Sequence, residues 1–430
     1  MSEIKNARAL ALELLEKAQK SKQYSNIALD HALDASGMSD ADKRLCSIIF
    51  YGVIERKLTL DHRISELSAR PLDQLDENVL CALRIGLYQL IYLDRIPAHA
   101  AINETVELCS RKSAGFVNAI LRSHTRNEQK EIPRDDLVKY LSLTYSVCPE
   151  LSKKLIEAYS EQEAENILKG FDRISDTTLR TNTLKISRNE LAEKLGEAEP
   201  TSVSPVGLYA KGAVKKLYGF DEGLFFVQDE ASQICVEVLG ASEGDLMLDL
   251  CSCPGSKSFG SAIRMNNKGK IIASDLHENK LSLVRSSAKR LGIDIIETRA
   301  ADARVFIPEL EATADRVLCD VPCSGFGVLA KKPELRYKDP KESENLPNIQ
   351  RAILDTACRY VKRGGTLVYS TCTLLPEENE KNLFSFLEAH SEFSLEPWQV
   401  GSLCADKGYI TLLPQLHNTD GFFIAKLVRK

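Results

Sequence analysis

The stretch Leu246-Met-Leu-Asp-Leu-Cys-Ser-Cys-Pro-Gly-Ser-Lys257 decides how the C-terminal half of this chain folds. Its first five residues are mostly apolar, as is typical of a buried strand, and the loop that follows leads into a predicted helix. Gly255 allows the backbone to approach a ligand closely, and a helix amino terminus favours anions. We therefore expect a strand, a ligand-binding loop and a helix in this order.

Strand and helix patterns alternate after this loop. Further strands are expected at 270–275, 294–297, 316–320 and 366–370, helices at 279–291 and 346–361, and an antiparallel terminal strand at 421–428. Such alternation predicts an open, mostly parallel α/β sheet over residues 226–430.

The preceding residues show two other patterns. Residues 1–130 carry apolar side chains at spacings of three and four, which predicts an all-α helical bundle. Residues 131–225 mix a helical stretch with short strand candidates at 177–183, 207–210 and 224–227, which indicates a small α+β connecting domain. The chain is therefore predicted to be multidomain, with boundaries near 130 and 225.

Composition limits the class of protein. Hydrophobic content of 43% and charged content of 27% are ordinary for a globular protein. No apolar stretch approaches the ~20 residues of a membrane helix, and the polar amino terminus shows no secretory signal. We therefore expect a cytoplasmic protein without a membrane partner, and nothing in the sequence suggests more than a monomer.

The twelve cysteines do not suggest disulfides or a metal site. Cytosolic thiols are kept reduced, and the close spacings, Cys251 to Cys253 and Cys319 to Cys323, lack paired histidines. We therefore expect no bound metal.

The net charge of −5 is mild evidence against nucleic-acid binding, although a local patch suffices. Two candidate basic patches are either RNA contacts or solvated faces. They comprise Lys211, Lys215 and Lys216, and Lys331, Lys332, Arg336 and Lys338.

The loop after the first strand indicates the type of ligand. It lacks the glycines of a dinucleotide or Walker motif, since Cys251 and Ser256 stand where a Walker loop needs glycine. Asp275 ends the second strand about twenty residues later, where an acid typically holds ribose hydroxyls. This pattern favours an adenosyl group without pyrophosphate, and hence S-adenosylmethionine. Asp275 could instead cap the next helix, and Asp302 could either bind adenine or simply form a turn.

Two cysteines end predicted strands. Cys323 lies in Asp320-Val-Pro-Cys-Ser-Gly325, and Cys372 lies in Ser370-Thr-Cys-Thr-Leu374. Parallel-sheet enzymes react at the carboxyl ends of their strands, and the thiolate is the nucleophilic form of cysteine. Either cysteine alone is as readily a packing thiol, but the pair indicates a site with two sulfur chemistries whose order the pattern leaves open.

These motifs resemble those of RNA cytosine-5 methyltransferases of the Sun/Fmu (RsmB) type, which modify 16S ribosomal RNA. The resemblance is carried by residues 226–233, 248–257, 320–325, 332–333, 369–373, 378–380 and 420–423. Residues 100–106 and 115–122 resemble the NusB-like RNA-binding domain of the same subfamily. The resemblance thus spans nearly the whole chain and implies an all-α NusB-like domain followed by a Rossmann-like methyltransferase domain.

The resemblance also implies roles for individual residues. Cys372 would attack cytosine C6, Cys323 would assist product release, and Asp320 would bind the cytosine edge. Lys257 would help position the base, which must be unstacked to enter the pocket. S-adenosylmethionine would contact Cys251, Ser252, Cys253, Pro254, Gly255, Ser256, Lys257, Asp275, Asp302 and Asp320, and the RNA partner would be 16S rRNA.

The chain departs from the family pattern at Ser252, Cys253, Ser256 and Val321, which we expect to affect cofactor affinity more than the reaction class. Three alternatives are a DNA cytosine-5 methyltransferase, an amino-group methyltransferase and an RNA-binding assembly factor without catalysis. Cys372 argues against the first, because those enzymes use the Pro-Cys cysteine as nucleophile. Asp320-Val-Pro-Cys323 differs from the second class's Asn/Asp-Pro-Pro-aromatic motif, and the intact cysteines argue against the third. Another rRNA or tRNA substrate also remains open.

Overall fold

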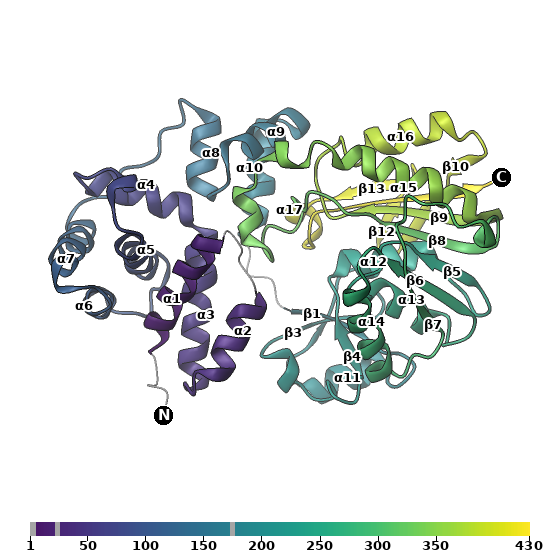
Figure 1. Cartoon of the computed structure of the whole chain (residues 1–430), viewed down its shortest axis with the longest axis horizontal. Helices are drawn as coiled ribbons and strands as arrows, with labels where there is room; N and C mark the ends of the chain where they lie inside the picture. The colour runs from purple at the N-terminus through teal and green to yellow at the C-terminus, as the bar shows by residue number, and fades with distance from the viewer. Residues whose placement is uncertain (1–5, 22–25, 173–176) are drawn as a thin grey trace. The chain divides into compact units, whose positions relative to one another are not determined.

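The computed structural model describes residues 6–21, 26–172 and 177–430. These residues form two compact units (Figure 1). Unit 1 contains the described residues up to Ile156 together with Lys331–Asp339, and unit 2 contains the described residues of Glu157–Ala330 and Pro340–Lys430. The three domains predicted from the sequence, with boundaries near 130 and 225, stay a prediction.

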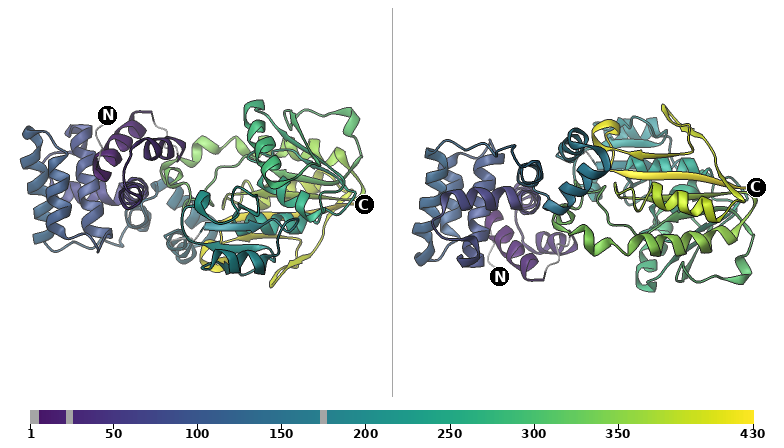
Figure 2. Two further views of the ribbon diagram at one scale, coloured as in Figure 1. Left: turned by 90° about the horizontal axis from the view of Figure 1, so that it is seen from below. Right: turned by 90° about the horizontal axis from the view of Figure 1, so that it is seen from above.

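Unit 1 is built from helices, which confirms the prediction from apolar spacing (Figure 2). Its core lies around the fifth helix, where Leu83, Ile85 and Leu87 are fully buried. The α-helices are α1 (Ala7–Ser21), α2 (Asn26–Ala35), α3 (Asp40–Glu55), α4 (Lys57–Leu67), α5 (Glu77–Tyr92), α6 (Ala98–Glu107), α7 (Arg111–Arg126), α8 (Leu137–Tyr145) and α9 (Pro149–Tyr159), the last of which continues into unit 2.

The segment Lys331–Asp339 leaves unit 2 and packs within unit 1. Arg336, in the short helix η4 (Pro333–Tyr337), is fully buried and donates a 2.8 Å hydrogen bond to the carbonyl of Tyr145. The hydroxyl of Tyr337 lies 2.9 Å from that of Ser146. The interpretation of this segment as a basic surface patch is therefore wrong for Arg336, whose charge is used inside the helical unit.

Unit 2 begins with α10 (Glu161–Gly170) and a small antiparallel sheet of order β2-β3-β1-β4. Its strands are β1 (Thr177–Thr181), β2 (Glu199–Pro200), β3 (Gly207–Ala210) and β4 (Phe225–Val227), with α11 (Arg188–Leu195) between the first two. The short strands predicted in this region are confirmed.

A larger mixed sheet of order β10-β14-β9-β8-β5-β6-β7 dominates unit 2, and β13 pairs with β14. Strands β5 to β9 are parallel, and β14 is antiparallel to β9 as predicted. The strands are β5 (Leu246–Asp249), β6 (Lys270–Asp275), β7 (Ile296–Ala300), β8 (Ala314–Asp320), β9 (Val361–Thr371), β10 (Phe393–Leu395), β13 (Tyr409–Leu412) and β14 (Phe422–Arg429), beside a separate pair, β11 (Trp398–Val400) and β12 (Leu403–Ala405).

Helices cover both faces of the larger sheet (Figure 1). Neighbouring strand residues face opposite layers, so that Met247 packs against one set of helices and Leu248 against the other. One layer holds α12 (Glu230–Leu239), α13 (Ser256–Arg264) and α14 (Glu278–Leu291), the other holds α15 (Leu346–Tyr360) and α16 (Glu380–Ala389), and α17 (Pro414–His417) precedes β14.

The order of the parallel strands reverses at β5. The chain runs outward from β5 to β6 and β7, then returns to β8 and β9 on the other side of β5. Ligands of open α/β sheets bind in the crevice outside the carboxyl ends of the strands at such a reversal. In the described part of the chain, no helix is both long and apolar enough to cross a bilayer.

Candidate active site

The loop between β5 and α13 follows the carboxyl end of β5, at this reversal. Its backbone is tied to the neighbouring strand because the N–H of Ser252 donates to the carbonyl of Ser274 at 2.8 Å. Gly255 has a φ of +106°, and a Cβ added there would lie 2.5 Å from the ring of Phe259. Only glycine fits this turn without strain, so the loop keeps the close backbone approach expected from the sequence.

The predicted carboxylates surround this loop. Burial, followed by the charges of Asp249, Asp320, Asp275 and Asp302, raises the pKa of the Cys251 thiol. Four carboxylates from three strand ends and a loop thus act on one side chain of this loop. The sequence predicted three of them as ligand contacts, and the structure brings these three together.

Two buried polar atoms of the loop lack partners. Asp249 Oδ2 accepts a 2.6 Å hydrogen bond from Ser258, but Asp249 Oδ1 and Ser252 Oγ have no hydrogen-bond partner among the described residues. Burial raises the pKa of Asp249 to about 7, although the Ser258 hydrogen bond opposes this rise. Because unpaired buried polar atoms are costly, both atoms suit a polar ligand in the loop. The loop therefore fits the adenosyl cofactor that the sequence indicated.

Asp275 and Asp302 lie at the carboxyl ends of β6 and β7. The helix cap of α14 is His277, not Asp275, and Asp275 Oδ1 accepts from the His277 N–H at 3.0 Å. Asp302 forms an ion pair with Arg304 at 2.6 Å, and hydrogen bonds from Arg304 lower its pKa. The N–H of Arg304 donates to Asp302 Oδ1 at 3.0 Å, which is the turn role given as the alternative interpretation, and the adenine contact stays a prediction.

Lys257 in the first turn of α13 and Asp320 at the end of β8 form an ion pair. Lys257 Nζ lies 2.7 Å from Asp320 Oδ2, and the hydroxyl of Ser370 donates to Asp320 Oδ1 at 2.8 Å. Burial is the largest single effect and lowers the pKa of Lys257, but the charge of Asp320, those of Cys235 and Asp249 and the Asp320 hydrogen bond together outweigh it and raise that pKa. Lys257 is therefore a fixed cation whose partner, with a side chain 28% exposed, is still accessible to a ligand.

The two predicted cysteines meet because of strand register. Asp320 at the end of β8 pairs with Ser370 near the end of β9, so the motifs that follow lie side by side. The sulfurs of Cys323 and Cys372 are 3.0 Å apart, and the backbone N–H of Cys372 points to the Cys323 sulfur at 3.2 Å. The hydrogen bond with Cys372, together with burial, raises the pKa of Cys323 well above its ordinary value.

A buried polar network holds the Pro-Cys turn. Glu378, which is 1% exposed, accepts from the Ser324 N–H at 2.9 Å and from Gln350 Nε2 at 2.8 Å. Gln350 also donates to the carbonyl of Pro322, and the Ser324 and Thr373 hydroxyls lie 2.6 Å apart. These contacts fix the residues on both sides of Cys323.

Sequence reasoning did not identify two of these supporting residues. Gln350 lies inside a long predicted helix, and no local signal marks it as different from a surface glutamine. Ser370 was considered only as a neighbour of Cys372. It ends a predicted strand, as Asp320 does, and this shared position could have identified it.

Comparison with known proteins agrees with this geometry. Residues 236–428 match the family model described as 16S rRNA methyltransferase RsmB/F, and residues 5–126 match the NusB family. The crystal structure of PH0851 has a TM-score of 0.81 at 26% identity and covers 98% of this chain and 99% of its own. NSun6 from Pyrococcus horikoshii with SFG, an S-adenosylmethionine analogue, has a TM-score of 0.59 at 26% identity and covers 65% of this chain and 97% of its own.

Curated relatives extend the match to full length. The probable ribosomal RNA small subunit methyltransferase B of Bacillus subtilis is 36% identical over 99% of both chains. The ribosomal RNA small subunit methyltransferase B of Escherichia coli O1:K1 is 32% identical over 100% of both chains. The chain therefore belongs to the RsmB/F family of ribosomal RNA methyltransferases, which take their methyl group from S-adenosylmethionine.

Proposed function

We propose that this enzyme methylates C5 of a cytosine in 16S rRNA through a temporary covalent bond between Cys372 and C6. The observation that carries the proposal is the 3.0 Å separation of the Cys323 and Cys372 sulfurs beside the Lys257–Asp320 ion pair. One thiol is enough for packing or for a single nucleophilic step. Two thiols within contact of each other suit a reaction that both makes and breaks a carbon–sulfur bond.

In the first step, the Cys372 thiolate forms a bond to C6, and the electron pair of the C5–C6 double bond becomes available at C5. Asp320 supports this shift by hydrogen bonding to the cytosine edge. Lys257 holds the Asp320 carboxylate in place through their 2.7 Å contact, which makes Lys257 a positioning residue for that hydrogen bond. C5 then takes the methyl group that S-adenosylmethionine supplies.

In the second step, Cys323 removes the C5 proton. While Cys372 is free, its hydrogen bond is the largest cause that raises the Cys323 pKa. Bonding of the Cys372 sulfur to C6 removes that interaction, but the 3.2 Å hydrogen bond from the Cys372 backbone N–H to the Cys323 sulfur persists. A backbone donor favours the thiolate form, so once the adduct exists Cys323 releases its own proton to solvent and then accepts the C5 proton as a thiolate. Loss of the C5 proton restores the C5–C6 double bond and releases Cys372 as a thiolate.

Residues 251–257 are proposed to hold the cofactor. The unpartnered Asp249 Oδ1 and Ser252 Oγ offer an acceptor and a hydroxyl to its polar groups, and Gly255 leaves room for close approach. Asp275 is placed at the end of β6, where an acid suits ribose hydroxyls. Asp302 is proposed to contact adenine through its carboxylate while that carboxylate stays paired with Arg304.

The identity of the RNA is supported by the NusB match over residues 5–126 and by the names of the full-length relatives. Another RNA cytosine-5 methyltransferase would share the catalytic unit. A NusB-like assembly factor without catalysis would not require the buried network around Cys323. We therefore favour catalysis on the small-subunit rRNA.

Two measurements test this function. Bisulfite sequencing of 16S rRNA from a deletion strain is expected to show one cytosine that loses its protection and regains it when the wild-type gene is supplied. Recombinant Cys372→Ala is expected to give no detectable methylation of the rRNA fragment that contains this cytosine. Unchanged protection in the deletion strain would reject the substrate, whereas full activity of Cys372→Ala would reject the nucleophile.

A further inference from the structure

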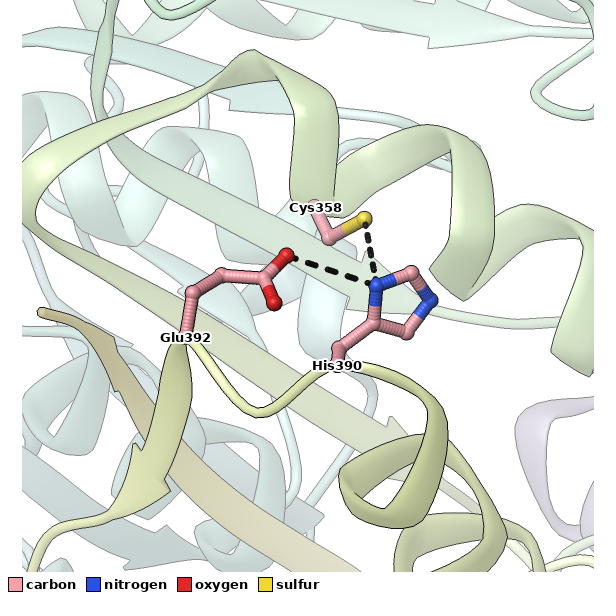
Figure 3. Close-up of side chains that lie close together, drawn as sticks. All are labelled: Cys358, His390 and Glu392. Atoms are coloured by element: carbon pink, nitrogen blue, oxygen red, sulfur yellow. Dashed lines mark hydrogen bonds and ion pairs between the residues drawn. The ribbon is translucent and has the colours of Figure 1, made fainter.

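Three side chains of metal-ligating types lie close together in unit 2 (Figure 3). Cys358 comes just before the start of β9, whereas Cys372 directly follows its end. Cys358 lies near the end of α15, His390 directly follows α16, and Glu392 precedes β10. His390 Nδ1 is 3.7 Å from the Cys358 sulfur and 3.4 Å from Glu392 Oε1. One ligand atom from each residue lies within 4.8 Å of the other two.

The two separations that involve His390 Nδ1 match the edges of a tetrahedral coordination shell. Bonds of about 2.0–2.3 Å at tetrahedral angles place neighbouring nitrogen, oxygen and sulfur ligands about 3.4–3.6 Å apart. The distances from His390 Nδ1, 3.7 Å to the Cys358 sulfur and 3.4 Å to Glu392 Oε1, lie within about 0.1 Å of this range. The third separation, between Cys358 Sγ and a Glu392 carboxylate oxygen, is no more than 4.8 Å, so a small adjustment of the exposed Glu392 side chain completes the shell.

The far side of the His390 ring is also arranged as in metal sites. Its Nε2 lies 3.0 Å from Asp355 Oδ1, and the ring stacks on Phe386 with a centroid separation of 4.5 Å. A carboxylate on the remote nitrogen fixes the ring and directs the lone pair of the other nitrogen toward a metal. A partner that orients His390 in this way is expected at a metal site.

Carboxylates flank the His390 ring on both sides, with Asp355 at Nε2 and Glu392 at Nδ1. A divalent cation displaces the thiol proton, forms a sulfur–metal bond and neutralises the charges of the resulting thiolate and of Glu392.

We propose that Cys358 Sγ, His390 Nδ1 and a Glu392 carboxylate oxygen bind a divalent cation of the zinc type, with water as the fourth ligand. Metal binding would join the end of α15 to the turn between α16 and β10. Gln350, which supports the Pro-Cys turn, lies eight residues before Cys358 on α15, about 12 Å along the helix axis. The proposed ion is therefore structural and takes no part in methyl transfer.

The proposal departs from the expectation of no bound metal drawn from cysteine spacing. That expectation considered cysteines close together in sequence, whereas His390 and Glu392 follow Cys358 by 32 and 34 residues. A metal-free protein offers a different explanation of the same contacts. A doubly protonated His390 would donate to Asp355 and Glu392, and Cys358 would remain a thiol.

Cobalt titration separates the two explanations. Reduced, chelator-treated full-length enzyme is titrated with Co²⁺, and the thiolate-to-cobalt charge-transfer band is recorded in the near ultraviolet. The proposal predicts one equivalent of Co²⁺ per chain with this band, and its displacement by Zn²⁺. Zn²⁺ is also expected to raise the melting temperature of the wild-type enzyme.

Matched variants assign the band to this site. Cys358→Ser is expected to abolish it, and Asp355→Asn to raise the Co²⁺ dissociation constant about tenfold. Glu392→Gln, at a side chain 42% exposed, weakens binding without disturbing the core and covers the case in which Cys358→Ser fails to fold. Cys404→Ser removes an exposed cysteine as the control and should leave the band unchanged. Absence of the band in the wild type, its survival in folded Cys358→Ser, or an unchanged Co²⁺ dissociation constant in Glu392→Gln would overturn the proposal.

Discussion

The Lys257–Asp320 ion pair gives a quantitative prediction. Lys257 is 8% exposed and its amine lies 2.7 Å from Asp320, so either single substitution leaves a charged group without its partner in a largely buried site. We consider Lys257→Met, Asp320→Asn and the double variant, which removes both charges.

The size of the effect follows from burial. Removing one partner of a buried ion pair costs about 3–5 kcal/mol. Because the Asp320 side chain is 28% exposed, solvent screening reduces the expected loss to about 2–3 kcal/mol for each single variant. The double variant contains no unpaired charge, so its loss should fall about 2 kcal/mol short of the sum of the single losses.

The chain provides its own probe for this cycle. Its single tryptophan, Trp398, is buried in β11 of unit 2, so its fluorescence during urea unfolding reports the unit that contains the ion pair. Methylation should stay absent in the double variant even though its stability partly recovers, because Asp320 is proposed to contact the cytosine. Single losses that add to the double loss within about 0.5 kcal/mol would refute a direct ion pair.

Three further outcomes are expected. Gly327→Ala places a Cβ against a backbone oxygen and should lower the free energy of unfolding, followed through Trp398, by about 1–3 kcal/mol; an unchanged urea midpoint would contradict this packing. Diamide, which takes up two electrons and two protons from a pair of thiols, should join Cys323 to Cys372, whose sulfurs lie 3.0 Å apart; peptide mapping that finds other cysteines linked first would count against this contact. Burial raises the pKa of Asp249 to about 7 in the folded state, from an ordinary 3.8. The protonated carboxyl therefore contributes its full stability below pH 3.8, and this contribution is lost as the pH rises through the folded-state pKa of about 7. Asp249→Asn should therefore gain stability over the wild type from about pH 4 to about pH 7, and a pH-independent difference would show that this carboxyl is not protonated in the folded state.

Local sequence patterns predicted the helices and strands of unit 2, because the spacing of apolar residues and the local composition differ between the two. The strand over 270–275 and the terminal antiparallel strand were found in this way, and so were two cysteines at strand ends. The register that pairs Asp320 with Ser370 and brings the sulfurs together depends on the whole sheet. No local signal in the sequence contains it.

Long-range placement also explains what the sequence left out. Arg336 belongs to a basic run that resembles a solvated face, yet its segment packs inside the helical unit. Gln350 has the same local sequence context as a surface residue, but the fold directs it to Pro322 and Glu378. In both cases a distant segment, not the neighbouring residues, determines the environment of the side chain.

Trapping of the covalent intermediate tests the central claim most directly. Cys323→Ala is incubated with S-adenosylmethionine and the 16S rRNA fragment, and the products are separated under denaturing conditions, with Cys323→Ala/Cys372→Ala as the control. The proposed division of labour predicts a stable protein–RNA adduct in the single variant, attached to Cys372 by peptide mass spectrometry, and none in the double variant. Normal turnover of Cys323→Ala without an adduct, or an adduct that survives the loss of Cys372, would contradict it.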